Sequence, residues 1–154
     1  STGYDTATGS FVLSGVSCEA CHGPYRSEHP AQSMEIARSA AMCGECHQST
    51  HAEWEVSQHG QAGVNCIDCH EVHSQHTHAT ASTNALCADC HRGQVDNFVH
   101  RQHEAEEVAC IDCHLSRPDG PQADTAAGEA MTAHSFTAEA VGCSHCHAPL
   151  ENMP

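Results

Sequence analysis

The chain has 154 residues, of which twelve are Cys and sixteen are His, and its formal charge is −15 because 20 acidic residues face only five basic ones. It contains no Lys, so it lacks the basic stripe of a nucleic-acid binder, and an anionic membrane surface is disfavoured as a partner. Aromatic residues make up 4%, which predicts that side chains alone do not form an ordinary apolar core.

Regular elements are expected to be few. Residues 1–16 are rich in Gly, Ser and Thr and predict an irregular arm, whereas 31–42 have helical propensity. Residues 51–59 predict a helix carrying Trp54, for which packing is favoured over an electron-relay role. Turn-forming residues in 115–132 indicate a linker. No apolar run is long enough to span a membrane, and no signal peptide begins at Ser1, which predicts a processed chain.

The cysteines decide the class of protein. Every Cys belongs to a Cys-x-x-Cys-His motif, and we number the six motifs in chain order. Their cysteines are Cys18 and Cys21, Cys43 and Cys46, Cys66 and Cys69, Cys87 and Cys90, Cys110 and Cys113, and Cys143 and Cys146. The His residues that follow them are His22, His47, His70, His91, His114 and His147.

Covalent haem explains this spacing better than the alternatives do. A zinc ribbon needs two Cys pairs per metal, and neither zinc nor a disulfide framework requires a His directly after each pair. In a c-type haem site the two thiols form thioethers to the porphyrin, and the following His binds the iron from the proximal side. The motifs therefore predict six covalent haems c in one domain, residues 1–154.

Six haems amount to about one per 26 residues, so the haems themselves are expected to form the core. Each haem also cross-links the chain and reduces the entropy of its unfolded state. The predicted fold is mostly α with little regular structure. Short helices and loops wrap around stacked haems, with little or no β.

An internal repeat relates residues 43–70 to residues 87–114 at a constant offset of 44. Each copy holds two motifs separated by the same gap. Outside the motifs, five of 22 positions are identical, including His59 and His103. A duplicated two-haem module is the interpretation.

Electron-transfer haems usually have a second, distal iron ligand, and ten His remain outside the proximal set. Repeat positions rank the candidates, because His59 matches His103, and His78 and His134 each precede a motif by nine residues. Met34 would raise a haem potential as a ligand, but packing is favoured for it. The predicted distal ligands, in order, are His59, His103, His78, His134, His29 and His73.

Two stretches resemble multihaem cytochromes related to hydroxylamine oxidoreductase and octahaem tetrathionate reductase. They are GVSCEACHGP at 15–24 with Ser-Glu-His at 27–29, and the run from Cys43 to His70 that contains Ser-Gln-His-Gly at 57–60. The resemblance covers roughly residues 2–115. It implies closely stacked c-type haems, alternately parallel and perpendicular, with distal ligands at His29 and His59.

The same resemblance brings enzymes into consideration. Reductases of this kind bind substrate at a haem whose proximal ligand is Lys, and this chain has none. Hydroxylamine oxidoreductases cross-link their catalytic haem to a Tyr, and only Tyr4 and Tyr25 exist here. We therefore expect no catalytic residues and no enzyme activity.

The predicted function is electron transport along six closely packed haems, in a periplasmic or extracellular protein, because haem of this type is attached outside the cytoplasmic membrane. The expected partners are redox proteins or copies of the chain itself. Two alternatives remain open. One is a subunit of an extracellular cytochrome filament, and the other is an enzyme or electron-entry subunit reducing small nitrogen or sulfur oxyanions.

Overall fold

In the computed structural model, most of the central part of the chain is described. The described residues are 7–8, 10, 16–24, 26–28, 31, 38–74, 76–78, 82–116, 122–123, 130–131, 133–138, 143 and 146–147. Most of the predicted N-terminal arm, the first part of the helix expected at 31–42, much of the predicted linker, and His29 and Met34 lie outside these residues.

Short helices dominate the described part. They are α1 (Cys18–His22), α2 (Ala40–Gly44), α3 (Gln48–Val56), α4 (Gln58–Gln61), α5 (Cys66–Cys69), α6 (Thr83–Val95), α7 (Phe98–Ala105) and α8 (Cys110–His114). The strands β1 (Gln122–Ala123) and β2 (Ala130–Met131) form a two-stranded antiparallel ladder within the predicted linker. The predicted fold class, mostly α with little β, is confirmed.

The haem motifs themselves start several of these helices. Helices α1, α5 and α8 each begin at the first Cys of a motif. At α5, Asp68 accepts a hydrogen bond from the Asn65 amide at 2.7 Å, and at α8, Asp112 accepts one from the Ala109 amide at 2.8 Å. Each Asp satisfies an amide at the start of its helix, so the second residue between the two cysteines helps to set the turn.

The helix expected over 51–59 is two helices. Helix α3 ends at Val56, and Ser57 precedes α4. The Ser57 hydroxyl donates to the Trp54 carbonyl at 2.7 Å and accepts from the Gly60 amide at 3.1 Å. The hydroxyl therefore closes one helix and caps the next, a role that competes with continuing a single helix.

The described residues hold almost no side-chain core. Ala40 and Ala133 are the buried apolar residues among them, and no large side chain there is fully buried. Trp54 donates through Nε1 to the Val64 carbonyl at 2.8 Å and packs beside His51, with ring centroids 5.4 Å apart. The expectation that side chains alone do not form an ordinary core is met in this part of the chain.

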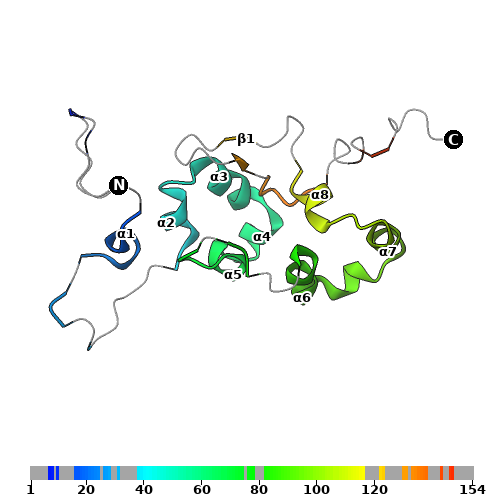
Figure 1. The fold of residues 1–154 in the computed structure, drawn as a ribbon, viewed down its shortest axis with the longest axis horizontal. Coiled ribbons are helices and arrows are strands. Elements are labelled where there is room, and N and C mark those ends of the chain that lie inside the picture. Colours follow the sequence, from blue (N-terminus) through cyan, green and yellow to red (C-terminus); the bar gives the residue numbers. More distant parts are fainter. Residues whose placement is uncertain are drawn as a thin grey trace.

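The helices follow one another along the long axis of the molecule (Figure 1). Helix α1 lies toward one end and α7 toward the other, with α2, α5, α6 and α8 between them. Helix α2 packs against α3 and α5, and α6 packs against α7 and α8. The structure thus carries the motifs through space in nearly the order in which they occur in the sequence. No helix in the described part of the chain is long and apolar enough to cross a membrane.

Candidate haem-binding site

One helical turn gathers the three side chains of a motif that are predicted to bind haem. The amides of His47, His70 and His147 donate to the carbonyls of the first Cys of their motifs, at 2.9, 2.8 and 2.8 Å. This turn brings the two thiols and the imidazole to one side of the backbone. All twelve cysteines are free thiols and none is fully buried, so each is open to thioether formation.

Successive motifs lie beside one another through their thiols. Cys43 and Cys66 share a hydrogen bond, and burial together with Cys43 raises the pKa of Cys66 to about 11. Cys87 and Cys110 share the same kind of contact, and burial together with Cys110 raises the pKa of Cys87 to about 11. These two pairs occupy equivalent positions in the repeat.

Further thiol contacts extend this series. Motif 3 lies next to motif 4, since burial, Asp68 and the neighbouring thiol of Cys90 raise the pKa of Cys69. Motif 5 lies next to motif 6, since burial and the neighbouring thiols of motif 6 raise the pKa of Cys113. Motifs 2 to 6 therefore form a continuous series of neighbours in chain order.

Four proximal His lie close to four of the predicted distal His. Each pair joins one motif to a separate segment of the chain, and the ring centroids are about as far apart as two imidazoles on opposite sides of one metal ion. The pairs, with centroid distance and interplanar angle, are His22–His73 (6.5 Å, 9°), His70–His134 (6.4 Å, 28°), His91–His59 (5.7 Å, 80°) and His147–His103 (6.0 Å, 83°).

The His59–His91 pair has the most informative geometry. The two Nε2 atoms face each other at 3.5 Å. An iron bound by two imidazoles, with metal–nitrogen bonds of about 2.0 Å, needs these atoms about 4 Å apart. Burial, and then the charges of His91 and His114, lower the pKa of His59 and favour the neutral ring that binds metals. The pair fits one iron with a shift of a few tenths of an ångström.

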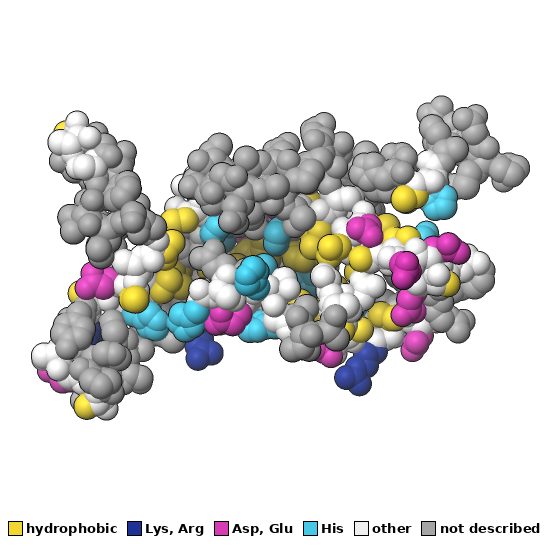
Figure 2. Space-filling view, in the orientation of Figure 1, with side chains coloured by type: hydrophobic (Ala, Val, Ile, Leu, Met, Phe, Trp, Pro, Cys, Tyr) yellow, Lys and Arg dark blue, Asp and Glu magenta, His cyan; other side chains and the backbone are white. Residues whose placement is uncertain are grey.

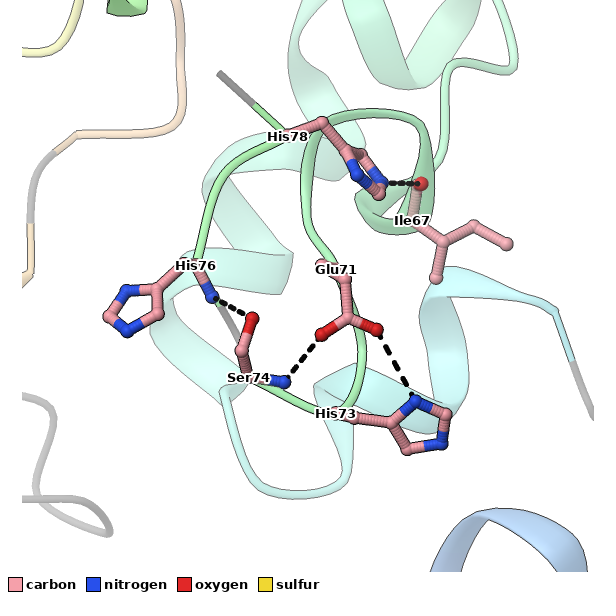
Figure 3. Close-up of polar contacts among 6 residues, drawn as sticks. All are labelled: Ile67, Glu71, His73, Ser74, His76 and His78. Carbon is pink, nitrogen blue, oxygen red and sulfur yellow. Dashed lines mark hydrogen bonds and ion pairs between the residues drawn. The ribbon is translucent and has the colours of Figure 1, made fainter. Parts of the chain in front are cut away.

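A carboxylate lies behind His73. Glu71 accepts the Ser74 amide at 2.6 Å through one oxygen, and its other oxygen lies 3.3 Å from His73 Nδ1 (Figure 3). The Ser74 amide lowers the pKa of Glu71 to about 2, so the carboxylate is charged. A carboxylate at Nδ1 places the proton on that nitrogen and leaves Nε2 free for a metal.

The other candidates have different contacts. His78 Nε2 lies 3.1 Å from the Ile67 carbonyl, and the ring of His76 points away from Glu71 (Figure 3). His114 Nδ1 lies 3.0 Å from the Phe136 carbonyl. His29 lies outside the described residues.

Two residues that contact these His pairs, Glu71 and Phe136, were not predicted from the sequence. The position of Glu71 between His70 and His73 was a usable signal, since carboxylates often orient metal-binding His. Phe136 had no comparable signal. It reaches the site only because the chain folds back onto α4 and α8.

The donor set fits haem. Among the described residues, no three His, Cys, Asp or Glu side chains converge on a point, as a directly bound metal ion would require. Haem iron differs, because the porphyrin supplies four nitrogens and the protein adds only two axial ligands. The apolar side chains of Val56 and Val72 are exposed, which offers apolar surface to a porphyrin. Figure 2 shows apolar and His side chains together over the middle of the molecule.

Comparisons with known proteins agree that these Cys and His residues form a set suited to haem. A family model described as the doubled CXXCH motif matches residues 11–52. A stretch of 73 residues is 30% identical to the multiheme cytochrome MtrA of Shewanella baltica (strain OS185), covering 40% of this chain. Both matches support a multihaem c-type cytochrome. No solved structure matches it.

The match to MtrA is partial, since it spans 22% of that protein's length. Neither match is to a hydroxylamine oxidoreductase or an octahaem tetrathionate reductase, so the resemblance to those families stays a prediction. What the comparisons add is agreement on the class of cofactor and its mode of attachment.

Proposed function

We propose that the protein binds six covalent haems c and passes electrons along them, with haems 2 to 6 following the order of the motifs. Attachment of such haems takes place outside the cytoplasmic membrane, so the proposed location is periplasmic or extracellular. The protein supplies attachment, axial ligands and electrostatic environment, whereas the redox chemistry belongs to the haems.

The observation that carries this proposal is the set of four His pairs. Each pair combines the proximal His of one motif with a His that the sequence nominates as distal, and each has a centroid separation between 5.7 and 6.5 Å. In the proposal, His73, His134, His59 and His103 complete the irons of motifs 1, 3, 4 and 6. His78 and His29 remain the proposed ligands for the irons of motifs 2 and 5, without assignment to either.

The proposed electron path follows the thiol contacts. Haems attached at neighbouring thiols lie close together, which favours fast transfer between them. Haem 1 joins this series beside haem 3, because its proposed distal ligand His73 follows the proximal His70 by three residues. The path therefore runs from the α1 end of the molecule toward the α7 end.

Matched local geometry supports the proposed two-haem duplication. The contacts Cys43–Cys66 and Cys87–Cys110 are equivalent under the 44-residue offset, and so are the Asp68 and Asp112 hydrogen bonds. His59 follows motif 2 and pairs with the proximal His of motif 4. In the same way, His103 follows motif 4 and pairs with the proximal His of motif 6. These shared contacts are more specific than the sequence identity alone.

The haem count tests the proposal. A pyridine haemochrome assay on normally matured protein should give six haems per chain, and the mass should exceed that of the polypeptide by six haems. A mediated redox titration should show reversible uptake of six electrons per chain. Four or fewer haems, or an irreversible titration, would contradict the proposal.

The proposed partners are redox proteins with basic docking surfaces, since the chain carries a formal charge of −15. Acidic side chains gather over the α7 end of the visible face (Figure 2). Because such steering is electrostatic, electron exchange with a basic small redox protein should slow as ionic strength rises.

A further inference from the structure

Residues 133–137, here called the bridging segment, connect parts of the site that are far apart in sequence. The Ala133 amide donates to the Leu115 carbonyl at 3.0 Å, next to α8. The His134 amide donates to Glu53 of α3 at 2.8 Å. Ala133 is buried, so the start of the segment is held firmly between these elements.

Phe136 in this segment has an unusual backbone. Its φ is 57°, in the left-handed region that residues other than Gly rarely adopt. Such a conformation persists only where surrounding contacts maintain it, and it often marks a functional position. Phe136 contacts three of the proposed haem-binding His: His114 through its carbonyl, and His59 and His134 through its ring.

The first contact uses the Phe136 carbonyl, which lies 3.0 Å from His114 Nδ1. A carbonyl can only accept, so the proton resides on Nδ1 and the Nε2 lone pair is left for iron. A hydrogen bond of this kind makes the imidazole a stronger donor to the metal, which favours ferric over ferrous iron.

The second contact uses the Phe136 ring. Its centroid lies 4.2 Å from that of His59 with an interplanar angle of 81°, an edge-to-face arrangement. The ring therefore limits rotation of the His59 imidazole, which itself stands at 80° to His91.

We propose that Phe136 is a positioning residue for two neighbouring haems: its ring orients His59 at haem 4, and its carbonyl fixes the tautomer and donor strength of His114 at haem 5. This inference rests on the proposed ligation of iron by His59 and His114. Its value to electron transfer is that one residue sets the ligand field of one haem and the potential of the next.

Electron paramagnetic resonance tests the contact of the ring. Two axial imidazoles with perpendicular planes give a low-spin ferric signal with a larger maximum g value than two parallel ones. The His59–His91 and His103–His147 pairs, at 80° and 83°, should both give the first kind. Phe136→Gly keeps the left-handed backbone accessible but removes the ring. One of the two large-g signals should shift, while the other serves as an internal reference.

The contact of the carbonyl needs a different variant. Pro fixes φ near −65°, so Phe136→Pro turns the carbonyl away from His114. One of the six haem midpoint potentials should then shift upward. The same potential should stay in place in Phe136→Gly, and Phe136→Tyr should retain both the large-g signals and all the potentials of the unaltered protein.

The possible outcomes separate this inference from the function on which it rests. Unchanged signals in Phe136→Gly, or unchanged potentials in Phe136→Pro, would overturn the role of the ring or of the carbonyl, with six low-spin haems still present. If instead His59→Ala left every haem low-spin, the proposed ligation itself would fail. Circular dichroism of each variant verifies that the helices are retained.

Discussion

Gly63 and Glu107 adopt the same left-handed conformation at equivalent positions of the repeat, with φ of 77° and 61°. Each ends the helix that carries a proposed distal ligand. The amide of the following Val donates back to the carbonyl of His59 at 2.9 Å or of His103 at 3.0 Å, which closes a Schellman-type turn. Gly is the residue best suited to this position, and the second copy has Glu there instead.

Replacing Glu107 with Gly should therefore stabilise the protein. The left-handed conformation costs about 1–2 kcal/mol for a residue with a Cβ, part of which is offset by the greater freedom of Gly in the unfolded chain. We expect Glu107→Gly to raise the free energy of unfolding by about 1 kcal/mol. The reciprocal variant Gly63→Ala should lower it by a similar amount. Denaturant titration followed by the haem absorbance measures both, and a lower stability of Glu107→Gly would contradict the explanation.

Helices α4 and α7 are short elements, and each places a proposed distal His beside a proximal His of another motif. Neither is long enough to be stable alone. An iron bond from each helix to its partner motif closes a loop of about 32 residues at His59–His91 and about 44 at His103–His147. The proposed haem ligation would thus be a tertiary cross-link as well as an electronic feature.

Removing either distal His should alter one haem only. His59→Ala and His103→Ala should each convert one haem of six to a high-spin form that binds cyanide. Covalent haem content should stay at six, since the thioethers and the proximal His remain. Absorption and electron paramagnetic resonance spectra measure the change.

Gln58→Ala and Gln102→Ala are matched controls for these variants. Each Gln directly precedes the His that is replaced, and the two Gln occupy equivalent positions of the repeat. Both should keep six low-spin haems. Unaltered low-spin spectra in both His variants would instead move the distal roles to His51, His76 or His100.

At the scale of the whole molecule, the described residues contain two buried apolar side chains, both Ala. Helix–helix packing of this kind buries too little apolar surface to offset the entropy of folding. The porphyrins are the proposed source of the missing apolar contacts, and the irons and thioethers tie the segments together. Folding and haem attachment are therefore expected to be coupled.

Protein produced without haem attachment should be largely unfolded. Far-UV circular dichroism should show loss of the helical signal, and thermal scans should lack a cooperative transition. As a control, Cys143→Ala/Cys146→Ala removes only the last haem and should preserve most of the helical signal. A haem-free chain with native-like helicity and a cooperative transition would contradict the proposed role of the haems as the core.

The isolated protein should not turn over nitrite or tetrathionate. All six motifs end in His, and no Lys is present to form the substrate-binding haem of the reductases that the sequence resembles. Assays with a reduced viologen donor should show no consumption above that of a simple electron-transfer cytochrome. Sustained turnover, preceded by a high-spin signal that changes on adding nitrite, would assign the protein to the enzymes.

Local sequence determined the cofactor chemistry and the character of the fold. The Cys-x-x-Cys-His motif lies within one helical turn, so its spacing alone predicts the haem-attaching thiols and the proximal His. The shortage of large apolar residues likewise predicted short helices and little side-chain core. Capping by Ser57, which divides the helix expected over 51–59, was a local effect that helical propensity alone did not reveal.

The pairing of the histidines depended on the tertiary structure. Repeat positions nominated His59 and His103, but only the folded chain brings them beside His91 and His147, and it brings the lowest-ranked candidate, His73, beside His22. Phe136 is the clearest case, since nothing in its local sequence points to His59 or His114. Its contacts arise because the chain returns after the β1–β2 ladder, and sequence patterns do not record which distant segments such a return will meet.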